Sequence, residues 1–140
     1  MPSAPPRLHL PDPLRRQLWG HAQAQAPEEC VGVLAGWEVE GGWQADAYAP
    51  LPNVAPRPQV QYQADPAALI RVLRGFREQE LELVGIFHSH PRGPSIPSPA
   101  DIAAAGYDVP YLIADLSAAS LRAFLLPHIQ EIRLTSSLNE

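Results

Sequence analysis

The sequence predicts an α/β fold with a mixed β-sheet, and three observations favour this class. Two Asp-Pro pairs, at 12–13 and 65–66, each open a segment in which apolar residues recur at helical spacing. Around these helices lie short runs rich in β-branched and aromatic residues, which are typical of strands. The last three runs, 110–115, 120–126 and 129–135, are separated by short connections, so we expect them to be antiparallel neighbours.

The first helix should follow a short strand at 7–10. Asp12 is its expected N-cap, and a buried stripe is expected from Leu14, Leu18 and Ala22. His21 lies on the same stripe, so we interpret it as a packed, hydrogen-bonded residue rather than a ligand.

Three strands are expected between the two helices. Residues 30–37 are almost wholly apolar, which indicates a strand buried on both faces. The glycine pair at 41–42 should turn the chain into a returning strand at 43–48. A proline-rich loop follows at 50–58, and the alternation at 59–63 predicts the third strand.

The second helix should begin after Asp65 and turn one apolar face inward, with three arginines outside. That face consists of Leu69, Ile70, Leu73 and Phe76. The next strand, 81–90, ends in His88-Ser89-His90 and stops at Pro91, which cannot donate to a sheet ladder. Because alternate side chains of a strand share a face, His88 and His90 project to the same side as a pair of metal ligands.

A loop rich in proline, 91–99, leads to Asp101, the first carboxylate after the two histidines. Two His and one carboxylate leave one tetrahedral position open for water, as in catalytic zinc sites. The stretch from Ser98 to Asp101 also fits an N-terminal helix cap, with Ser98 as N-cap of a short helix that reaches 105. This interpretation explains both residues without a metal. The two interpretations are compatible, because a residue at a helix start can also bind metal.

His88-Ser89-His90-Pro91, followed after six residues by Ser98-Pro99-Ala100-Asp101, resembles the signature of the JAMM (MPN+) metalloproteases of the compact prokaryotic type. The resemblance implies that His88, His90 and Asp101 bind one Zn²⁺ per chain, and that Ser98 stabilises the tetrahedral intermediate. It also implies a three-layer α/β/α arrangement with a mixed sheet, similar to that of the cytidine deaminases. The expected organisation is a single domain over 1–140, with its core at about 7–135.

The same family has a glutamate base in an upstream strand that reads roughly Glu-x-Cys-Gly. Aligning this chain on Gly32 and Gly36 places the base at Glu29. Cys30 then falls one position before the usual cysteine, so Glu28 stays a second candidate. Glu29 can reach the metal only if the strand after it pairs with the strand of the two histidines.

By resemblance, the substrate is a ubiquitin-like or β-grasp sulfur-carrier protein, whose C-terminal Gly-Gly tail lies extended beside the site and adds a strand. Hydrolysis after this Gly-Gly would free a conjugated protein, trim an extended tail or release an amino acid such as cysteine. The eukaryotic deubiquitinases carry insertions where this chain has short segments, 57–61 and 106–110, which disfavours linkage-specific cleavage of ubiquitin chains. The alternative is a non-catalytic MPN scaffold that binds partners, but such proteins usually lack the zinc ligands.

Composition disfavours several other classes. The net charge of −5 and the lack of a basic run argue against nucleic-acid binding. No apolar run approaches the roughly 18 residues of a membrane span. The chain start lacks the features of a signal peptide and the chain has one cysteine, so we expect a cytoplasmic protein.

The remaining cysteine and histidines are not expected to carry chemistry. One cysteine excludes a zinc deaminase site, and no His-Glu-x-x-His motif is present. Cys30 lies in an apolar strand, where a thiol is usually inert. His9 and His128 stand alone and are expected to be surface or packing residues.

Overall fold

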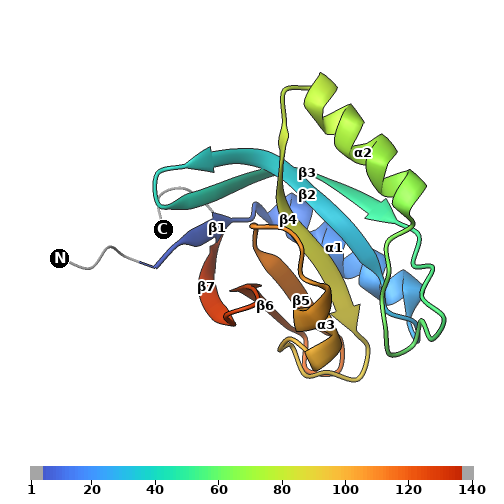
Figure 1. Ribbon diagram of the computed structural model, residues 1–140. Helices are drawn as coiled ribbons and strands as arrows, with labels where there is room; N and C mark the ends of the chain where they lie inside the picture. Colours follow the sequence, from blue (N-terminus) through green and yellow to red (C-terminus); the bar gives the residue numbers. More distant parts are fainter. Residues whose placement is uncertain (1–4, 137–140) are drawn as a thin grey trace.

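A computed structural model describes residues 5–136, which form seven strands and three helices (Figure 1). The first four residues, which belong to the segment examined for a signal peptide, and the last four lie outside the described residues. None of the three described helices is long and apolar enough to cross a membrane. The elements are β1 (Arg7–His9), α1 (Asp12–Gln25), β2 (Val31–Val39), β3 (Gly42–Leu51), α2 (Pro66–Glu78), β4 (Glu82–His90), α3 (Pro99–Ala104), β5 (Tyr111–Asp115), β6 (Ser120–Leu125) and β7 (Gln130–Thr135).

The strands form one mixed sheet in the order β1-β3-β2-β4-β5-β6-β7. β1 is parallel to β3 and β7, β4 is parallel to β5, and the other pairs are antiparallel. The predicted mixed sheet and the antiparallel neighbours at the end of the chain are therefore confirmed. The three-layer α/β/α description is wrong. Because β1 pairs with β3 on one edge and β7 on the other, the sheet closes into a barrel instead of forming an open middle layer.

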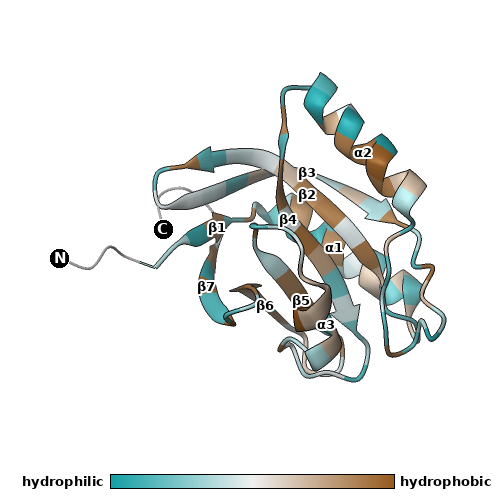
Figure 2. Ribbon diagram, viewed as in Figure 1, coloured by the Kyte–Doolittle hydropathy of each residue, from teal (hydrophilic) through white to brown (hydrophobic). Residues whose placement is uncertain are grey.

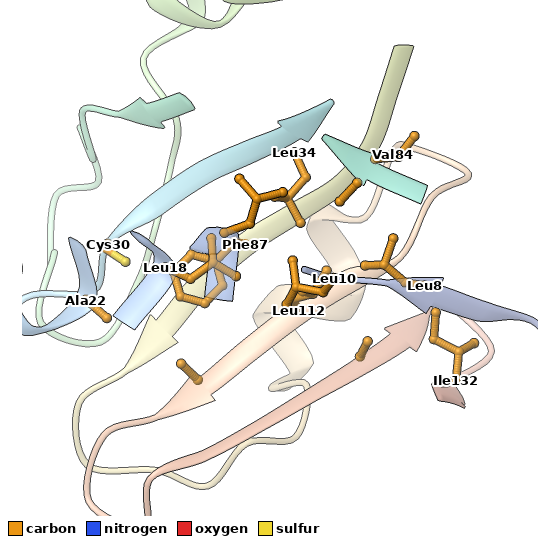
Figure 3. Close-up of a cluster of buried hydrophobic side chains, with 14 residues drawn as sticks. Leu8, Leu10, Leu18, Ala22, Cys30, Leu34, Val84, Phe87, Leu112 and Ile132 are labelled. Carbon is orange, nitrogen blue, oxygen red and sulfur yellow. The ribbon is translucent and has the colours of Figure 1, made fainter. Parts of the chain in front are cut away.

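One group of buried apolar residues, called the inner cluster here, joins α1 to all seven strands (Figure 3). Its members are Leu8, Leu10, Leu14, Leu18, Ala22, Cys30, Leu34, Ala45, Val84, Phe87, Leu112, Ala114, Ala123 and Ile132. Leu14, Leu18 and Ala22 of α1 are buried in it at helical spacing, so the predicted stripe is confirmed. Phe87 of β4 and Leu112 of β5 are fully buried in the same cluster. This packing fixes β4, the strand that ends at the two histidines, in its place between β2 and β5.

A second group of buried apolar residues, called the outer cluster here, lies on the other face of β2 and β4 and is covered by α2 (Figure 1). Its members are Val31, Val33, Ala35, Leu51, Ala68, Phe76, Ile86 and Tyr111. Asp65 caps α2 as predicted, accepting a hydrogen bond of 3.0 Å from the amide of Ala68. Phe76 is buried in this cluster, but Ile70 is 57% exposed, so its predicted place on the inner face is wrong. Successive side chains of a helix point about 100° apart, so when Leu69 faces the sheet, the next residue, Ile70, points toward solvent. Figure 2 shows hydrophobic residues along β4 that give way to hydrophilic ones at its carboxyl end.

Two further local predictions are wrong. The N-cap of α1 is Pro11 and not Asp12, because the Pro11 carbonyl accepts the first amide hydrogens of the helix and Asp12 is its first residue. Residues 59–63 form a turn and an irregular segment instead of a strand. The side chain of Asn53 hydrogen-bonds two backbone groups of this segment, which are thereby withdrawn from a strand ladder.

The histidines outside β4 have structural surroundings, as predicted. His21 Nδ1 lies 2.7 Å from the Tyr48 hydroxyl on the face of α1 that packs against the sheet. His9 is buried and hydrogen-bonds Thr135, whereas His128 is exposed.

Candidate metal centre and active site

β4 brings His88 and His90 together at its carboxyl end. It is flanked by β2 and β5, and His88 pairs in register with Val31 on one side and Ile113 on the other. Both imidazoles are buried and project to the same side, as predicted. Their Nε2 atoms lie 3.0 Å apart, and the rings meet edge to face with centroids 4.8 Å apart. Two possible ligand atoms are thus held by a central strand.

The start of α3 brings Asp101 to the same point. Ser98 is the N-cap, its Oγ accepts a hydrogen bond of 3.1 Å from the Asp101 amide, and Asp101 Oδ2 accepts one of 2.9 Å from the Ser98 amide. The predicted capping box is therefore confirmed. The same Oδ2 atom lies 3.1 Å from His88 Nε2 and 3.2 Å from His90 Nε2. The helix cap thus leaves Asp101 Oδ2 beside both ring nitrogens, where the same oxygen could also bind a metal.

The hydrogen-bond pattern of these three side chains fits a bound cation. His90 Nδ1 lies 2.6 Å from the Pro94 carbonyl, which can only accept, so Nδ1 carries a proton, and in the neutral ring that metal binding requires Nε2 presents a lone pair. His90 Nε2, His88 Nε2 and Asp101 Oδ2 then share at most one proton among three mutually close atoms. A cation would satisfy all three lone pairs, and two His with one carboxylate match a catalytic zinc donor set.

Burial and hydrogen bonding set the charge states of this group. Burial is the largest influence on His88 and lowers its pKa, which favours the neutral ring that metal binding requires. Burial opposes ionisation of Asp101, but hydrogen bonds to His88 and His90 outweigh it and hold the pKa of Asp101 well below its usual range. Burial opposes protonation of His90, but hydrogen bonds to Asp101 and to the Pro94 carbonyl outweigh it and raise the pKa of His90. The group therefore combines a ring that favours the neutral form, a ring that protonates more readily and an ionised carboxylate.

Glu29 lies beside this centre, although 59 positions separate it from His88 in the sequence. β2 pairs with β4, and a hydrogen bond of 2.8 Å from the Cys30 amide to Ser89 Oγ extends this contact toward Glu29. The predicted pairing of the two strands is thus confirmed. One carboxylate oxygen of Glu29 and ring nitrogens of His88 and His90 lie within 4.8 Å of one another.

The Glu29 side chain is buried, with 5% of the residue exposed, and its Oε1 has no hydrogen-bond partner among the described residues. Burial raises the pKa of Glu29 to about 7; the charge of His90 lowers it by a smaller amount, and the charge of Asp101 raises it slightly further. Glu28, the second candidate for the base, is half-buried and lies outside the group of possible ligands among the described residues. With a pKa of about 7, the Glu29 carboxyl group can exchange a proton near neutral pH.

A cleft of about 440 Å³ opens beside the centre. Glu29, His90 and Ser98 line it together with the proline-rich loop 91–98 and part of the loop 52–65.

Cys30 is fully buried, and burial raises its pKa to about 11, which agrees with the prediction of an inert thiol.

Tyr62 is a neighbour of the centre that sequence reasoning missed. Its ring stacks on His88 with centroids 4.2 Å apart and an interplanar angle of 26°. The only sequence signal was the alternation at 59–63, which suggested a strand and hid the contact. Asn53, in the proline-rich loop, was also missed, although Asn is a residue that organises loops through side-chain hydrogen bonds.

The fold and the site define a class of protein. The family described as prokaryotic homologs of the JAB domain (Prok-JAB) matches residues 11–127, and the chain belongs to this family. A solution structure of a protein from Desulfitobacterium hafniense is similar, with a TM-score of 0.82, 26% identity and coverage of 94% of each chain.

Among individual proteins, the chain is similar to the "Probable TtuB-protein conjugate cleaving protease" of Thermus thermophilus. The two are 42% identical over 127 residues, or 91% of this chain and 81% of the relative. The "Desampylase" of Haloferax volcanii is 34% identical over 68% of this chain and 70% of its own length. The "CysO-cysteine peptidase" of Mycobacterium tuberculosis is 33% identical over 59% of this chain and 54% of its own length. The predicted JAMM-type peptidase class is confirmed by the family and these relatives.

Proposed function

We propose that this peptidase is zinc-dependent and hydrolyses the bond after the C-terminal Gly-Gly of a ubiquitin-like or β-grasp sulfur-carrier protein. The observation that carries the proposal is the convergence of His88 Nε2, His90 Nε2 and Asp101 Oδ2 within 3.2 Å of one another, beside the buried Glu29. The named activities of the relatives, against TtuB conjugates, as a desampylase and against CysO-cysteine, support the substrate class.

His88, His90 and Asp101 are the proposed ligands of one Zn²⁺ per chain, and Glu29 is the proposed base. Asp101 is preferred to Glu29 as third ligand because its Oδ2 is in hydrogen-bond contact with both imidazoles, whereas the group containing Glu29 extends to 4.8 Å. When bound, zinc would lower the pKa of a coordinated water to about 7 and polarise the scissile carbonyl. Three protein ligands leave the open position that this chemistry needs.

The chain's own groups then move the protons. Glu29 accepts a proton from the attacking water and passes it to the leaving nitrogen, a role suited by its pKa of about 7. Ser98 Oγ accepts a hydrogen bond from the Asp101 amide, so its hydroxyl hydrogen is available for the developing oxyanion. The capping box thus orients the Ser98 side chain for its catalytic role.

The substrate tail is proposed to run along the loops that line the cleft. β4 is flanked by β2 and β5, so it offers no free edge for an added strand. An extended tail must therefore hydrogen-bond to loop segments, and the candidates are 52–65 and 91–98, both of which contribute to the cleft.

The remaining parts of the proposal concern organisation and location. We propose that one domain, with its core at about 7–135, carries the whole site, since every proposed site residue lies within it. A cytoplasmic location is proposed because the chain has a single cysteine, which is buried. No feature of the described residues favours the non-catalytic scaffold, because all five proposed site residues are present and adjacent.

A panel of carrier fusions tests the function. Ubiquitin-like and sulfur-carrier proteins ending in Gly-Gly, each extended by a short peptide, by a lysine-linked protein or by cysteine, are incubated with the zinc-loaded enzyme. Mass spectrometry should find cleavage directly after Gly-Gly in at least one of them, and a matched Ala-Ala tail should stay intact. A chelator should stop cleavage and added zinc should restore it. Cleavage that survives the chelator contradicts the metal, and an intact panel contradicts the substrate class.

A further inference from the structure

His88 lacks the hydrogen bond that normally orients a metal-binding imidazole. Such a ring usually donates its second N–H to a carbonyl or carboxylate, which fixes both tautomer and orientation. His90 follows this pattern through the Pro94 carbonyl. His88 Nδ1 is buried and has no hydrogen-bond partner among the described residues. The orientation of the His88 ring is therefore not fixed through Nδ1 by any described residue.

The Tyr62 ring lies against His88. It stacks on the His88 imidazole with centroids 4.2 Å apart and planes inclined by 26°. His88 is fully buried, and its ring also contacts the ring of His90 edge to face. Stacking on a flat face restricts the tilt of an imidazole without using either nitrogen.

Asn53 holds the loop that carries Tyr62. Its Nδ2 donates to the Gln61 carbonyl at 3.0 Å, and its Oδ1 accepts from the Gln63 amide at 2.9 Å, so the neighbours of Tyr62 on both sides are fixed. The same Nδ2 donates to the backbone carbonyl of Glu29 at 2.9 Å, and Oδ1 also accepts from the Ala55 amide at 3.0 Å. Every hydrogen-bonding position of this amide is used.

We propose that Tyr62 and Asn53 are positioning residues of the metal centre. The Tyr62 ring sets the orientation of His88, and the Asn53 amide fixes both the Tyr62 loop and the backbone of Glu29. The inference rests on the proposed function, since it assumes that His88 binds the metal. It adds two residues outside the ligand set, and it links His88 and Glu29 through a single loop.

Zinc affinity tests the role of Tyr62 directly. The dissociation constant of Zn²⁺ is measured by competition with a chromophoric chelator, and the visible spectrum of the Co²⁺-loaded protein reports ligand geometry. Tyr62→Leu should weaken zinc binding about tenfold or more and change the cobalt spectrum. Tyr62→Phe keeps the ring and should retain both. Tyr107→Leu, a matched control at a tyrosine that is 41% exposed, should leave both unchanged.

Asn53 provides an independent arm. Asn53→Asp keeps the size and the acceptor oxygen but removes the donors to Gln61 and Glu29, so zinc binding should weaken about tenfold. Combined with Tyr62→Leu, it should add little, because both act on the same ring. Circular dichroism of the metal-free variants checks folding. If Tyr62→Leu fails to fold, Asn53→Asp and Tyr62→Phe still decide.

The outcomes separate this inference from the proposed function. Wild-type zinc affinity and spectrum in Tyr62→Leu or in Asn53→Asp would overturn the positioning role. Loss of affinity in Tyr62→Phe equal to that in Tyr62→Leu would also overturn it, because the ring face would then not be the relevant group. A wild-type chain that binds no zinc would instead refute the metal centre itself.

Discussion

Replacing Glu29 by Gln tests the part of the mechanism that depends on long-range folding. Glu29→Gln keeps the size and shape of the side chain but cannot accept a proton. Glu29 is 5% exposed, and the titratable groups next to it are the proposed zinc ligands, which are not free to replace it as base. Loss of general base catalysis should lower kcat by about 10²- to 10⁴-fold, or roughly 3–5 kcal/mol of transition-state stabilisation.

The assay combines turnover of a cleavable carrier fusion with zinc content measured by elemental analysis. Glu29→Gln should retain one zinc per chain, because Asp101 and not Glu29 is the proposed third ligand. Glu28→Gln is the matched control, with the same change of charge one residue away, and should keep wild-type turnover. Loss of zinc in Glu29→Gln would show that Glu29 is a ligand. Loss of turnover in Glu28→Gln alone would show that the alignment is displaced by one residue.

Four other variants test the site and the fold. Asp101→Ala should lose most of its zinc while the metal-free chain keeps its circular dichroism spectrum, and full zinc occupancy would refute its ligand role. Ser98→Ala should cost about 1 kcal/mol of stability and lower turnover by roughly 10²-fold with zinc retained; a lowered melting temperature with unchanged turnover would leave Ser98 only its capping role. Asp65→Ala should cost about 1 kcal/mol in urea unfolding without affecting zinc binding, whereas unchanged stability would contradict its cap. Gly36→Ala places a Cβ 1.8 Å from the backbone oxygen of Gln44 in β3, so it should destabilise the chain by about 1–3 kcal/mol or more, and wild-type stability would contradict this packing.

Most of the secondary structure could be predicted because its signals are local. Asp65 and Ser98 each stand before a proline at a helix start, and the structure confirms both as caps. Closure of the barrel had no local signal. β1 has three residues, and it pairs with β3 and with β7 near the other end of the chain, which depends on the packing of the whole sheet.

The candidate site was predictable to different degrees. His88 and His90 follow from the period of a strand, and Asp101 from the loop after it. The position of Glu29 depends on the pairing of β2 with β4, so only the family resemblance indicated it. Tyr62 could not be found, because its alternating surroundings indicate a strand, whereas hydrogen bonds to the Asn53 side chain decide its actual conformation.

Anomalous X-ray scattering at the zinc edge, measured on crystals of the zinc-loaded protein, tests the central claim most directly. The account predicts one zinc per chain, about 2.0–2.2 Å from His88 Nε2, His90 Nε2 and a carboxylate oxygen of Asp101, with the Glu29 carboxylate beside it but not coordinated. A zinc held by Glu29 in place of Asp101, or no zinc at these histidines, would contradict it.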